Sequence, residues 1–128
     1  EWFVAGHFIL AAGDKEKSLN DIRTLLDRRS QTQPTGTANC GSVFRNPPSN
    51  FAGRLIEQCG LKGKRLGGAH VSEKHANFII NAEKAKAKDV YKLISKIRER
   101  IWKEFRIKLE LEIVLVGFDD TNTRILES

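Results

Sequence analysis

The segment that most limits how this chain can fold is residues 85–105, where apolar side chains recur every three or four positions. This is the period of an α-helix, and lysines and arginines fill many of the positions between. The recurring apolar residues are Val90, Leu93, Ile94, Ile97, Ile101 and Phe105. A stripe of this width has to be covered by other parts of the chain. The sequence therefore predicts a long core helix with a solvated back.

Short strand-like segments supply a surface for this helix. Residues 66–71 and 77–81 are predicted as strands, and residues 78–80 are apolar on both faces, which is typical of a central strand. Residues 109–116 alternate between two faces, and Glu112 shares its face with valines, so its surroundings are partly apolar. The expected fold class is α+β, a small sheet of about three strands with packed helices.

Two shorter helices are predicted before this sheet. Ser18, with Asp21 three residues later, resembles a capping box that starts a helix ending near Arg29. A second helix covers residues 51–59, and Gly60 is placed to end it.

The chain has the length of one domain, 128 residues, and its 40% hydrophobic and 30% charged content is typical of a globular protein. Residues 1–12 are predicted as a buried strand, and residues 31–39 as a connector. The chain contains no methionine and opens directly into that strand, so we expect a piece of a longer protein. Its apolar runs are shorter than the roughly 18 residues that span a bilayer, and no membrane partner is expected.

The net charge of +6 is concentrated in residues 45–74, which hold six basic and two acidic residues. Such a segment favours an anionic partner (a nucleic acid, a nucleotide or a phosphorylated metabolite), and a solvated basic surface is the other interpretation. Phe51 is its only aromatic residue, which disfavours base stacking with a nucleic acid. The glycine-rich residues 60–68 are no Walker A loop, because Gln58 and Arg65 stand where glycine and serine or threonine are required.

Two cysteines, Cys40 and Cys59, are 19 residues apart, a spacing that matches no metal or redox motif. We interpret them as reduced thiols of a cytoplasmic protein. No metal site is predicted.

Residues 41–47, Gly-Ser-Val-Phe-Arg-Asn-Pro, place a hydroxyl, a cation and an amide within seven positions. Pro47 stops any regular element there, and Ser49 and Asn50 follow as candidate N-caps of the next helix. Such a turn can present a hydroxyl and backbone N–H groups to a ligand, or it can be an ordinary loop. Local chemistry leaves both interpretations open.

Several segments together resemble the UDP-N-acetylenolpyruvoylglucosamine reductase (MurB) family in order and spacing. They are residues 41–47, 52–57, 60–63, 67–69 and 71–81. The motifs Gly-Ser-x-Phe-Arg-Asn-Pro and Ser-Glu-Lys-His-Ala-Asn-Phe-Ile-x-Asn are specific when they occur in one chain, and the second resembles the shorter, type II members. Residues 109–117 resemble the closing strand of that family, so the resemblance covers residues 1–117.

The resemblance implies the substrate-binding, C-terminal part of an enzyme of peptidoglycan synthesis. In such enzymes NADPH reduces FAD, and the reduced flavin passes hydride to UDP-N-acetylglucosamine enolpyruvate, which yields UDP-N-acetylmuramate. Residues 1–12 then correspond to the last strand of an FAD-binding domain whose remainder is absent. We therefore expect this chain alone to hold neither cofactor and to be inactive. Its expected partners are the UDP-sugar substrate and the missing FAD domain.

The resemblance also assigns site residues. The proton-donating serine of the family falls on Ser42, and its active-site glutamate falls on Glu112. The uridine-nucleotide contact falls on Asn46. Arg45, where relatives often have lysine, keeps a cation, which we assign to the substrate diphosphate because of its charge.

Parts of the chain depart from the family pattern. Residues 35–39 match no family contact, and Leu111 stands where relatives often have proline, which would alter strand pairing but leaves Glu112 aligned. His70 and His75 lie in matching segments but have no role to transfer, and we interpret them as structural or surface histidines.

The expected organisation is a remnant of the FAD-binding domain at residues 1–17, a helix and connector at 18–40, the substrate-binding domain at 41–117 and a tail at 118–128. Two other functions stay open. One is a stand-alone module that binds a nucleotide sugar or a nucleic acid through residues 45–74. The other is a purely structural domain in which Ser42 and Glu112 take no part in chemistry.

Overall fold

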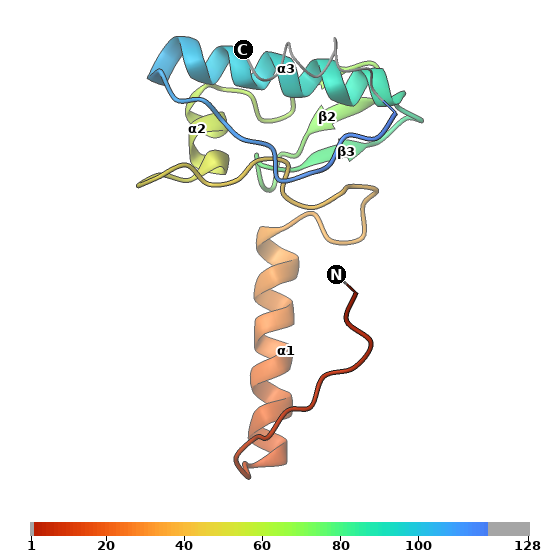
Figure 1. The fold of residues 1–128 in the computed structure, drawn as a ribbon, viewed down its shortest axis with the longest axis vertical. Coiled ribbons are helices and arrows are strands. Elements are labelled where there is room, and N and C mark those ends of the chain that lie inside the picture. The colour runs from red at the N-terminus through yellow and green to blue at the C-terminus, as the bar shows by residue number, and fades with distance from the viewer. Residues whose placement is uncertain (1, 118–128) are drawn as a thin grey trace.

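The computed structural model describes residues 2–117, which form three α-helices and a three-stranded antiparallel sheet. α1 (Lys15–Thr32) stands apart from the other elements, whereas α3 (Ala87–Phe105) lies along the sheet and the short α2 (Ala52–Gln58) (Figure 1). The strands are β1 (Arg65–Leu66), β2 (Ala69–Val71) and β3 (Ile79–Asn81). The predicted α+β class is confirmed.

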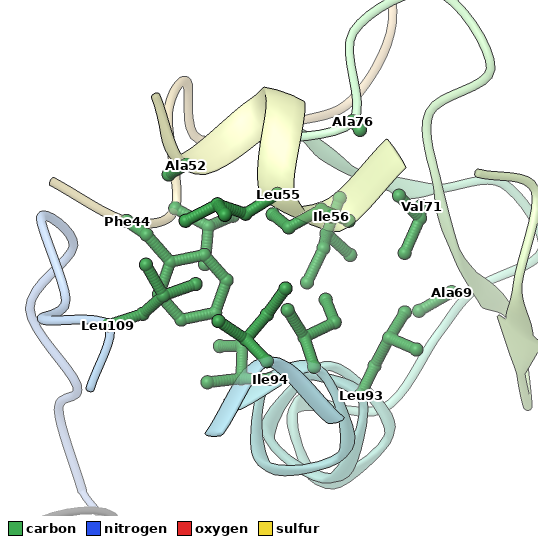
Figure 2. Close-up of a cluster of buried hydrophobic side chains, with 14 residues drawn as sticks. Phe44, Ala52, Leu55, Ile56, Ala69, Val71, Ala76, Leu93, Ile94 and Leu109 are labelled. Carbon is green, nitrogen blue, oxygen red and sulfur yellow. The ribbon is translucent and has the colours of Figure 1, made fainter. Parts of the chain in front are cut away.

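The hydrophobic core lies between α3, α2 and the sheet (Figure 2). On α3, the side chains of Leu93, Ile94, Ile97 and Ile101 are at most 1% exposed, so the predicted apolar stripe is confirmed. The core residues that meet this stripe from other elements include Phe44, Ala52, Leu55, Ile56, Ala69, Val71 and Leu109. Removing these side chains from water is the main force that holds the sheet, α2 and α3 together.

The segment predicted as one strand, residues 66–71, is a tight hairpin instead. β1 and β2 pair in antiparallel fashion with Leu66 opposite Ala69, so Gly67 and Gly68 form the turn between them. Gly67 has a positive φ of 54°, a conformation that glycine adopts readily. A side chain at Gly68 would collide with backbone atoms of the loop that follows β3. The two glycines therefore fix the hairpin.

β2 lies at the centre of the sheet and β3 at its edge, so the prediction of a central strand over residues 78–80 is wrong. Two of the three apolar side chains there, Phe78 and Ile79, are buried without a further strand, and Ile80 is half-buried. Ile79 is 4% and Phe78 is 7% exposed. At the edge, the N–H of Asn81 donates to the carbonyl oxygen of Ala38 (2.8 Å).

The strand predicted over residues 109–116 is reduced to one antiparallel bridge, which joins Leu111 to Phe44. Its partner is a short extended stretch outside the sheet, so no longer ladder develops in the described part of the chain. The alternation of faces is confirmed, because Leu109 is 1% exposed and Val114 is 85% exposed. The predicted alternation of burial is right, and only the extent of pairing is wrong.

α2 ends as predicted. Cys59 is its C-cap, and Gly60 follows with a φ of 66°. The N–H groups of Gly60 and Leu61 donate to the carbonyl oxygens of Glu57 and Ile56 at 2.8 and 3.2 Å, which are the two bonds of a Schellman motif.

α1 begins earlier than predicted, because Asp14 rather than Ser18 is its N-cap. The carboxylate of Asp14 accepts from the N–H of Lys17 (2.8 Å), and the hydroxyl of Ser18 donates to the carbonyl oxygen of Asp14 (2.7 Å). The helix ends at Thr32 rather than near Arg29.

The apolar face of α1 is uncovered. Leu19, Ile22, Leu25 and Leu26 are between 46% and 63% exposed, and no residue of this helix is buried by the rest of the described chain. Four large aliphatic side chains thus face outward along one helix.

Residues 2–14 form neither helix nor strand, so the strand predicted over residues 1–12 is absent. A strand needs a hydrogen-bonded neighbour, and no strand of residues 2–117 pairs with this segment. Its side chains are exposed, with Trp2 at 96% and Phe8 at 85%. The predicted tail at residues 118–128 lies outside the described residues. Across residues 2–117 no helix combines the length and the apolar character needed to cross a membrane.

Candidate active site

A hollow of about 230 Å³ brings together three of the four residues that the sequence assigned to a site. Ser42, Asn46 and Glu112 all line it, although Glu112 is 70 positions away from Ser42 in the sequence. The other residues that line this hollow are Phe44, Phe51, Gly53, Arg54, His75 and Asn77. Arg45 is exposed and is not among the described residues that line the hollow.

Ser42 and Glu112 are brought near each other by backbone hydrogen bonds. The N–H of Glu112 donates to the carbonyl oxygen of Val43, and the N–H of Arg45 donates to the carbonyl oxygen of Glu110, both at 2.9 Å. Val43, which follows Ser42 directly, is 1% exposed. The turn that carries the serine is therefore attached to the segment that carries the glutamate.

The loop before Ser42 is organised by Asn39. Its side-chain oxygen accepts from the N–H of Gly41 (2.9 Å), and its Nδ2 donates to the carbonyl oxygen of Pro34 (3.1 Å). Gly41 has a φ of 84°, the left-handed region that glycine adopts without strain. Residues 35–39, which matched no family contact, thus shape the approach to Ser42.

Asn46 has a structural bond in addition to its place in the hollow. Its Oδ1 accepts from the N–H of Ala52 (3.0 Å), the first residue of α2. The predicted N-caps Ser49 and Asn50 are wrong, because Phe51 is the N-cap and makes no side-chain cap bond. The Oδ1 of Asn46 thus satisfies an N–H at the start of α2 that has no partner within the helix. The side-chain amide is held in place by this bond, and its Nδ2 remains available as a donor.

The hollow contains both signs of charge. Arg54 projects from α2 and Glu112 lies on the bridge segment, while His75 contributes an imidazole. Val114 and Val116 are 85% and 84% exposed, and Glu112 is exposed as well, so the predicted shared face is confirmed and is turned toward solvent. The large apolar side chains that line the hollow are those of Phe44 and Phe51.

His75 is held in one orientation. Its Nδ1 accepts from the N–H of Asn77 (3.2 Å), and its ring packs edge-on to Phe78 with centroids 5.0 Å apart. A Cβ on Gly53 would come within 3.1 Å of the His75 ring, so α2 packs closely on it. Burial lowers the pKa of His75 below its ordinary value, and the neutral ring is favoured.

This lowered pKa predicts that stability falls in acid. Because the unfolded chain takes up the His75 proton first, the stabilisation is complete above about pH 6.5 and is lost as the pH falls below it. We expect the free energy of unfolding, measured in urea, to fall less between about pH 7.5 and about pH 5.5 in His75→Gln than in the unchanged chain.

The matched control for this prediction is His7→Gln, which alters a histidine in the exposed segment before α1. It should keep the full pH dependence of the unchanged chain. Equal pH dependence in His75→Gln and the unchanged chain would show that His75 titrates as it does in the unfolded state.

A second hollow, of about 380 Å³, also borders Ser42. Arg29 and Gln33 contribute to it from the end of α1 and just beyond, and Phe78 contributes from the segment before β3. Within residues 2–117 no group of three or more histidine, cysteine, aspartate or glutamate residues is placed to hold a metal ion.

Six residues that line the first hollow were not predicted as site residues, and the polar ones among them are Arg54, His75 and Asn77. In the sequence, Arg54 is only one of the six basic residues of segment 45–74, and His75 is interpreted as a structural or surface histidine. A signal for Asn77 was present, because an amide among apolar residues just before a strand needs hydrogen-bond partners if it is buried. Asn77 is 4% exposed.

The hollow lies within a stretch of sequence that has known relatives. A profile of the C-terminal domain of UDP-N-acetylenolpyruvoylglucosamine reductase matches residues 33–116, which include every residue that lines it. The chain belongs to the UDP-N-acetylenolpyruvoylglucosamine reductase (MurB) family.

Individual MurB proteins agree with this assignment. The chain is 55% identical over 117 residues to the reductase of Methylococcus capsulatus, covering 91% of this chain and 38% of that protein. It is 50% identical over 125 residues to the reductase of Legionella pneumophila, covering 97% of this chain and 41% of that protein. The crystal structure of MurB from Thermus caldophilus superposes with a TM-score of 0.63 at 39% identity, over 79% of this chain and 35% of that one. The chain thus spans about two-fifths of the length of the reductases it matches.

Proposed function

We propose that this chain is the substrate-binding, C-terminal part of a flavin-dependent reductase of peptidoglycan synthesis. The reductase would convert UDP-N-acetylglucosamine enolpyruvate to UDP-N-acetylmuramate with NADPH. The observation that carries the proposal is that Ser42, Asn46 and Glu112 meet at one hollow in a chain of the MurB family. A hydroxyl, an amide and a carboxylate at one hollow are the groups that such a reaction needs.

The chemistry assigns a role to each of two side chains. Addition of hydride to C3 of the enolpyruvyl group leaves an enolate at C2, beside the substrate carboxylate. This carbon is basic enough to take a proton from an unactivated hydroxyl, so Ser42 would serve as the general acid. Glu112 would stabilise the enol form by a hydrogen bond to its oxygen.

The nucleotide end of the substrate needs donors and cations. Asn46 retains Nδ2 as a donor for the uridine diphosphate, because its Oδ1 is used by the N–H of Ala52. Arg54 is a cation that lines the hollow, and Arg45 is a second cation on the same turn as Asn46. We assign Arg54 and Arg45 to the diphosphate because guanidinium groups bind phosphate oxygens in bidentate geometry.

The flavin belongs to a part of the enzyme outside this chain. A hollow of about 230 Å³ is smaller than the roughly 300–1,000 Å³ of sites that hold drug-sized ligands. It is large enough for the reacting end of the substrate but too small to hold a flavin together with it. FAD would supply the hydride and NADPH would reduce it, both held by the preceding domain. This chain alone is expected to be colourless and inactive.

The uncovered face of α1 supports a preceding domain as partner. Leu19, Ile22, Leu25 and Leu26 expose an apolar stripe that a larger protein would cover. We propose that the chain is organised as a remnant of the FAD domain at residues 1–17, a helix and connector at 18–40, and the substrate-binding domain at 41–117.

We also propose a cytoplasmic location, because Cys40 and Cys59 are free thiols, as is usual in reducing compartments.

The basic segment 45–74 is less available to a nucleic acid than its charge suggests. Lys62 pairs with Glu57 at 2.7 Å, and Arg65 pairs with Glu83 at 3.2 Å. Lys74 donates to the carbonyl oxygen of Ser30 (2.8 Å). These cations are partly satisfied within the chain, so we prefer the nucleotide sugar as the anionic ligand.

The proposal is tested by titrating this chain with UDP-N-acetylglucosamine enolpyruvate and following backbone amide signals by NMR. We expect saturable shifts at residues 42–46 and at Glu112, and weaker binding by about tenfold in Asn46→Ala, which loses one hydrogen bond to a charged group. Asn20→Ala, on the exposed surface of α1, is the matched control and should bind normally.

A short RNA provides the competing ligand. Shifts with RNA alone would transfer the assignment to a nucleic-acid module. In the full-length enzyme, absence of turnover of the UDP-sugar with NADPH would contradict the proposed reaction itself.

A further inference from the structure

Asn77 lies two residues before β3 and is bonded to the turn that follows Ser42. The N–H of Phe44 donates to its Oδ1 (3.0 Å), and its Nδ2 donates to the carbonyl oxygen of Phe44 (2.8 Å). The backbone carbonyl oxygen of Asn77 also accepts from the N–H of Val43 (2.9 Å). One residue therefore satisfies three backbone groups directly after the serine.

The same turn is bonded to the glutamate segment on its other side. The carbonyl oxygen of Val43 accepts from the N–H of Glu112 (2.9 Å). Val43 thus bonds to Asn77 through its N–H and to Glu112 through its carbonyl oxygen. A displacement of Asn77 would shift Ser42 and Glu112 relative to each other.

An apolar residue could fill the volume of Asn77 but could not replace these bonds. The side chain is 96% buried, and an unpaired N–H or carbonyl group in such a place costs about 1–3 kcal/mol. The side-chain amide of Asn77 bonds to both backbone polar groups of Phe44 at once. It therefore fixes the orientation of the Phe44 backbone as well as its distance from Asn77. The N–H of Asn77 donates in addition to Nδ1 of His75 (3.2 Å), so its position also sets that ring.

We propose that Asn77 is a positioning residue of the proposed reaction: through the backbone of Val43 and Phe44 it fixes the Ser42 hydroxyl relative to Glu112. The inference rests on the proposed function, because it concerns the same hollow. It goes further in assigning catalytic alignment to a buried amide that contacts the turn instead of the substrate.

The test is Asn77→Asp in the full-length enzyme. An ionised carboxylate can still accept from the N–H of Phe44, but it repels the carbonyl oxygen to which Nδ2 donates. A protonated carboxyl restores both bonds, since its O–H donates and its C=O accepts. Burial raises the pKa of a carboxyl at such a place, which brings the protonated form within reach of mild acid.

We expect kcat with the UDP-sugar to be lower by roughly 10- to 100-fold relative to the unchanged enzyme at about pH 7.5, the scale expected for a misplaced catalytic group. Relative to the unchanged enzyme at each pH, kcat should recover at about pH 5.5, whereas KM should change less. The titratable and charged groups that face this place are His75, Glu112 and Arg54, and they are the same in both proteins.

The matched control is Asn81→Asp, the same chemical change on β3. Asn81 is exposed, and its Oδ1 accepts from the N–H of Ala85 (2.8 Å), a bond that a carboxylate keeps. This variant should show normal kcat at both pH values. A recovery in acid that occurs only at position 77 is a signature that general destabilisation would not produce.

A second measurement does not depend on catalysis. The N–H of Val43 donates to the backbone carbonyl oxygen of residue 77, and this bond should loosen when the carboxylate repels the turn. In this chain, amide hydrogen exchange at Val43 should therefore be faster in Asn77→Asp than in Asn81→Asp at about pH 7.5, and the difference should shrink at about pH 5.5. Should Asn77→Asp fail to fold at neutral pH, Asn77→Ser replaces it. The serine can keep one of the bonds, and a folded variant with lowered kcat supports the inference.

Normal kcat in a folded Asn77→Asp or Asn77→Ser enzyme overturns the inference and leaves the proposed function intact, since Asn77 would then serve stability alone. An unchanged enzyme that does not turn over the UDP-sugar overturns the proposed function, and this inference with it. Lowered kcat that does not recover in acid, with normal exchange at Val43, also overturns the positioning role.

Discussion

Ser42→Ala in the full-length enzyme is expected to slow the half-reaction that consumes the UDP-sugar by about 100-fold or more, while reduction of the flavin by NADPH keeps its rate. The reason is that the variant lacks the hydroxyl proton for C2, and general acid catalysis contributes about 10²- to 10⁴-fold. The two half-reactions are measured separately by stopped-flow absorbance of the flavin.

The matched control is Ser49→Ala, which removes an exposed hydroxyl from the next turn without touching the residues that line the hollow. Both of its half-reactions should be normal. Equal rates for Ser42→Ala and the unchanged enzyme would remove Ser42 from the mechanism. A loss confined to flavin reduction would place Ser42 at the other half-reaction.

Leu93→Ala in this chain is expected to lower the free energy of unfolding by about 2–5 kcal/mol, the cost of a cavity in a packed core. Leu93 is fully buried between α3 and the sheet. A domain of this size is stable by about 5–15 kcal/mol, so the variant should lose much of its stability. Urea denaturation followed by circular dichroism measures the change.

Leu25→Ala is the same substitution on the uncovered face of α1, where the leucine is 63% exposed. In this chain it should change stability by no more than about 0.5 kcal/mol. In the full-length enzyme it should cost about 2 kcal/mol if the preceding domain covers that face. A cost as large as that of Leu93→Ala in this chain would show that α1 is already packed in solution.

The parts of the fold that the sequence predicts well are those fixed by periodic burial. α3 follows from its stripe, and the end of α2 at Gly60 follows from the φ that its Schellman motif requires. The hairpin was missed because residues 66–71 were interpreted as one strand, while the glycine pair inside them makes a turn. The strand predicted at residues 1–12 is absent for a different reason. Pairing depends on a neighbour, and local pattern carries no information on whether one is present.

Some residues of the candidate site are likewise predictable from the sequence, and others are not. Resemblance to MurB supplied Ser42, Asn46 and Glu112, and the structure places all three at one hollow. For Asn77 the sequence indicates only that a buried amide needs hydrogen-bond partners; it does not identify the partner, Phe44, which is 33 positions away. Arg54 required knowledge of which side of α2 faces the turn. Asn77 and Arg54 take their places through contacts with residues that are distant in the sequence, and only the folded structure shows those contacts.

The bridge between residues 43–45 and 110–112 has a consequence for which residues the family can accept at position 111. Its two bonds use the N–H of Glu112 and the carbonyl oxygen of Glu110, and neither uses the N–H of Leu111. A proline at this position would lack the N–H, and its ring would hold φ at about −65°. Proline at position 111 would therefore remove neither of the two bridge hydrogen bonds, and Glu112 would keep its own bond to Val43.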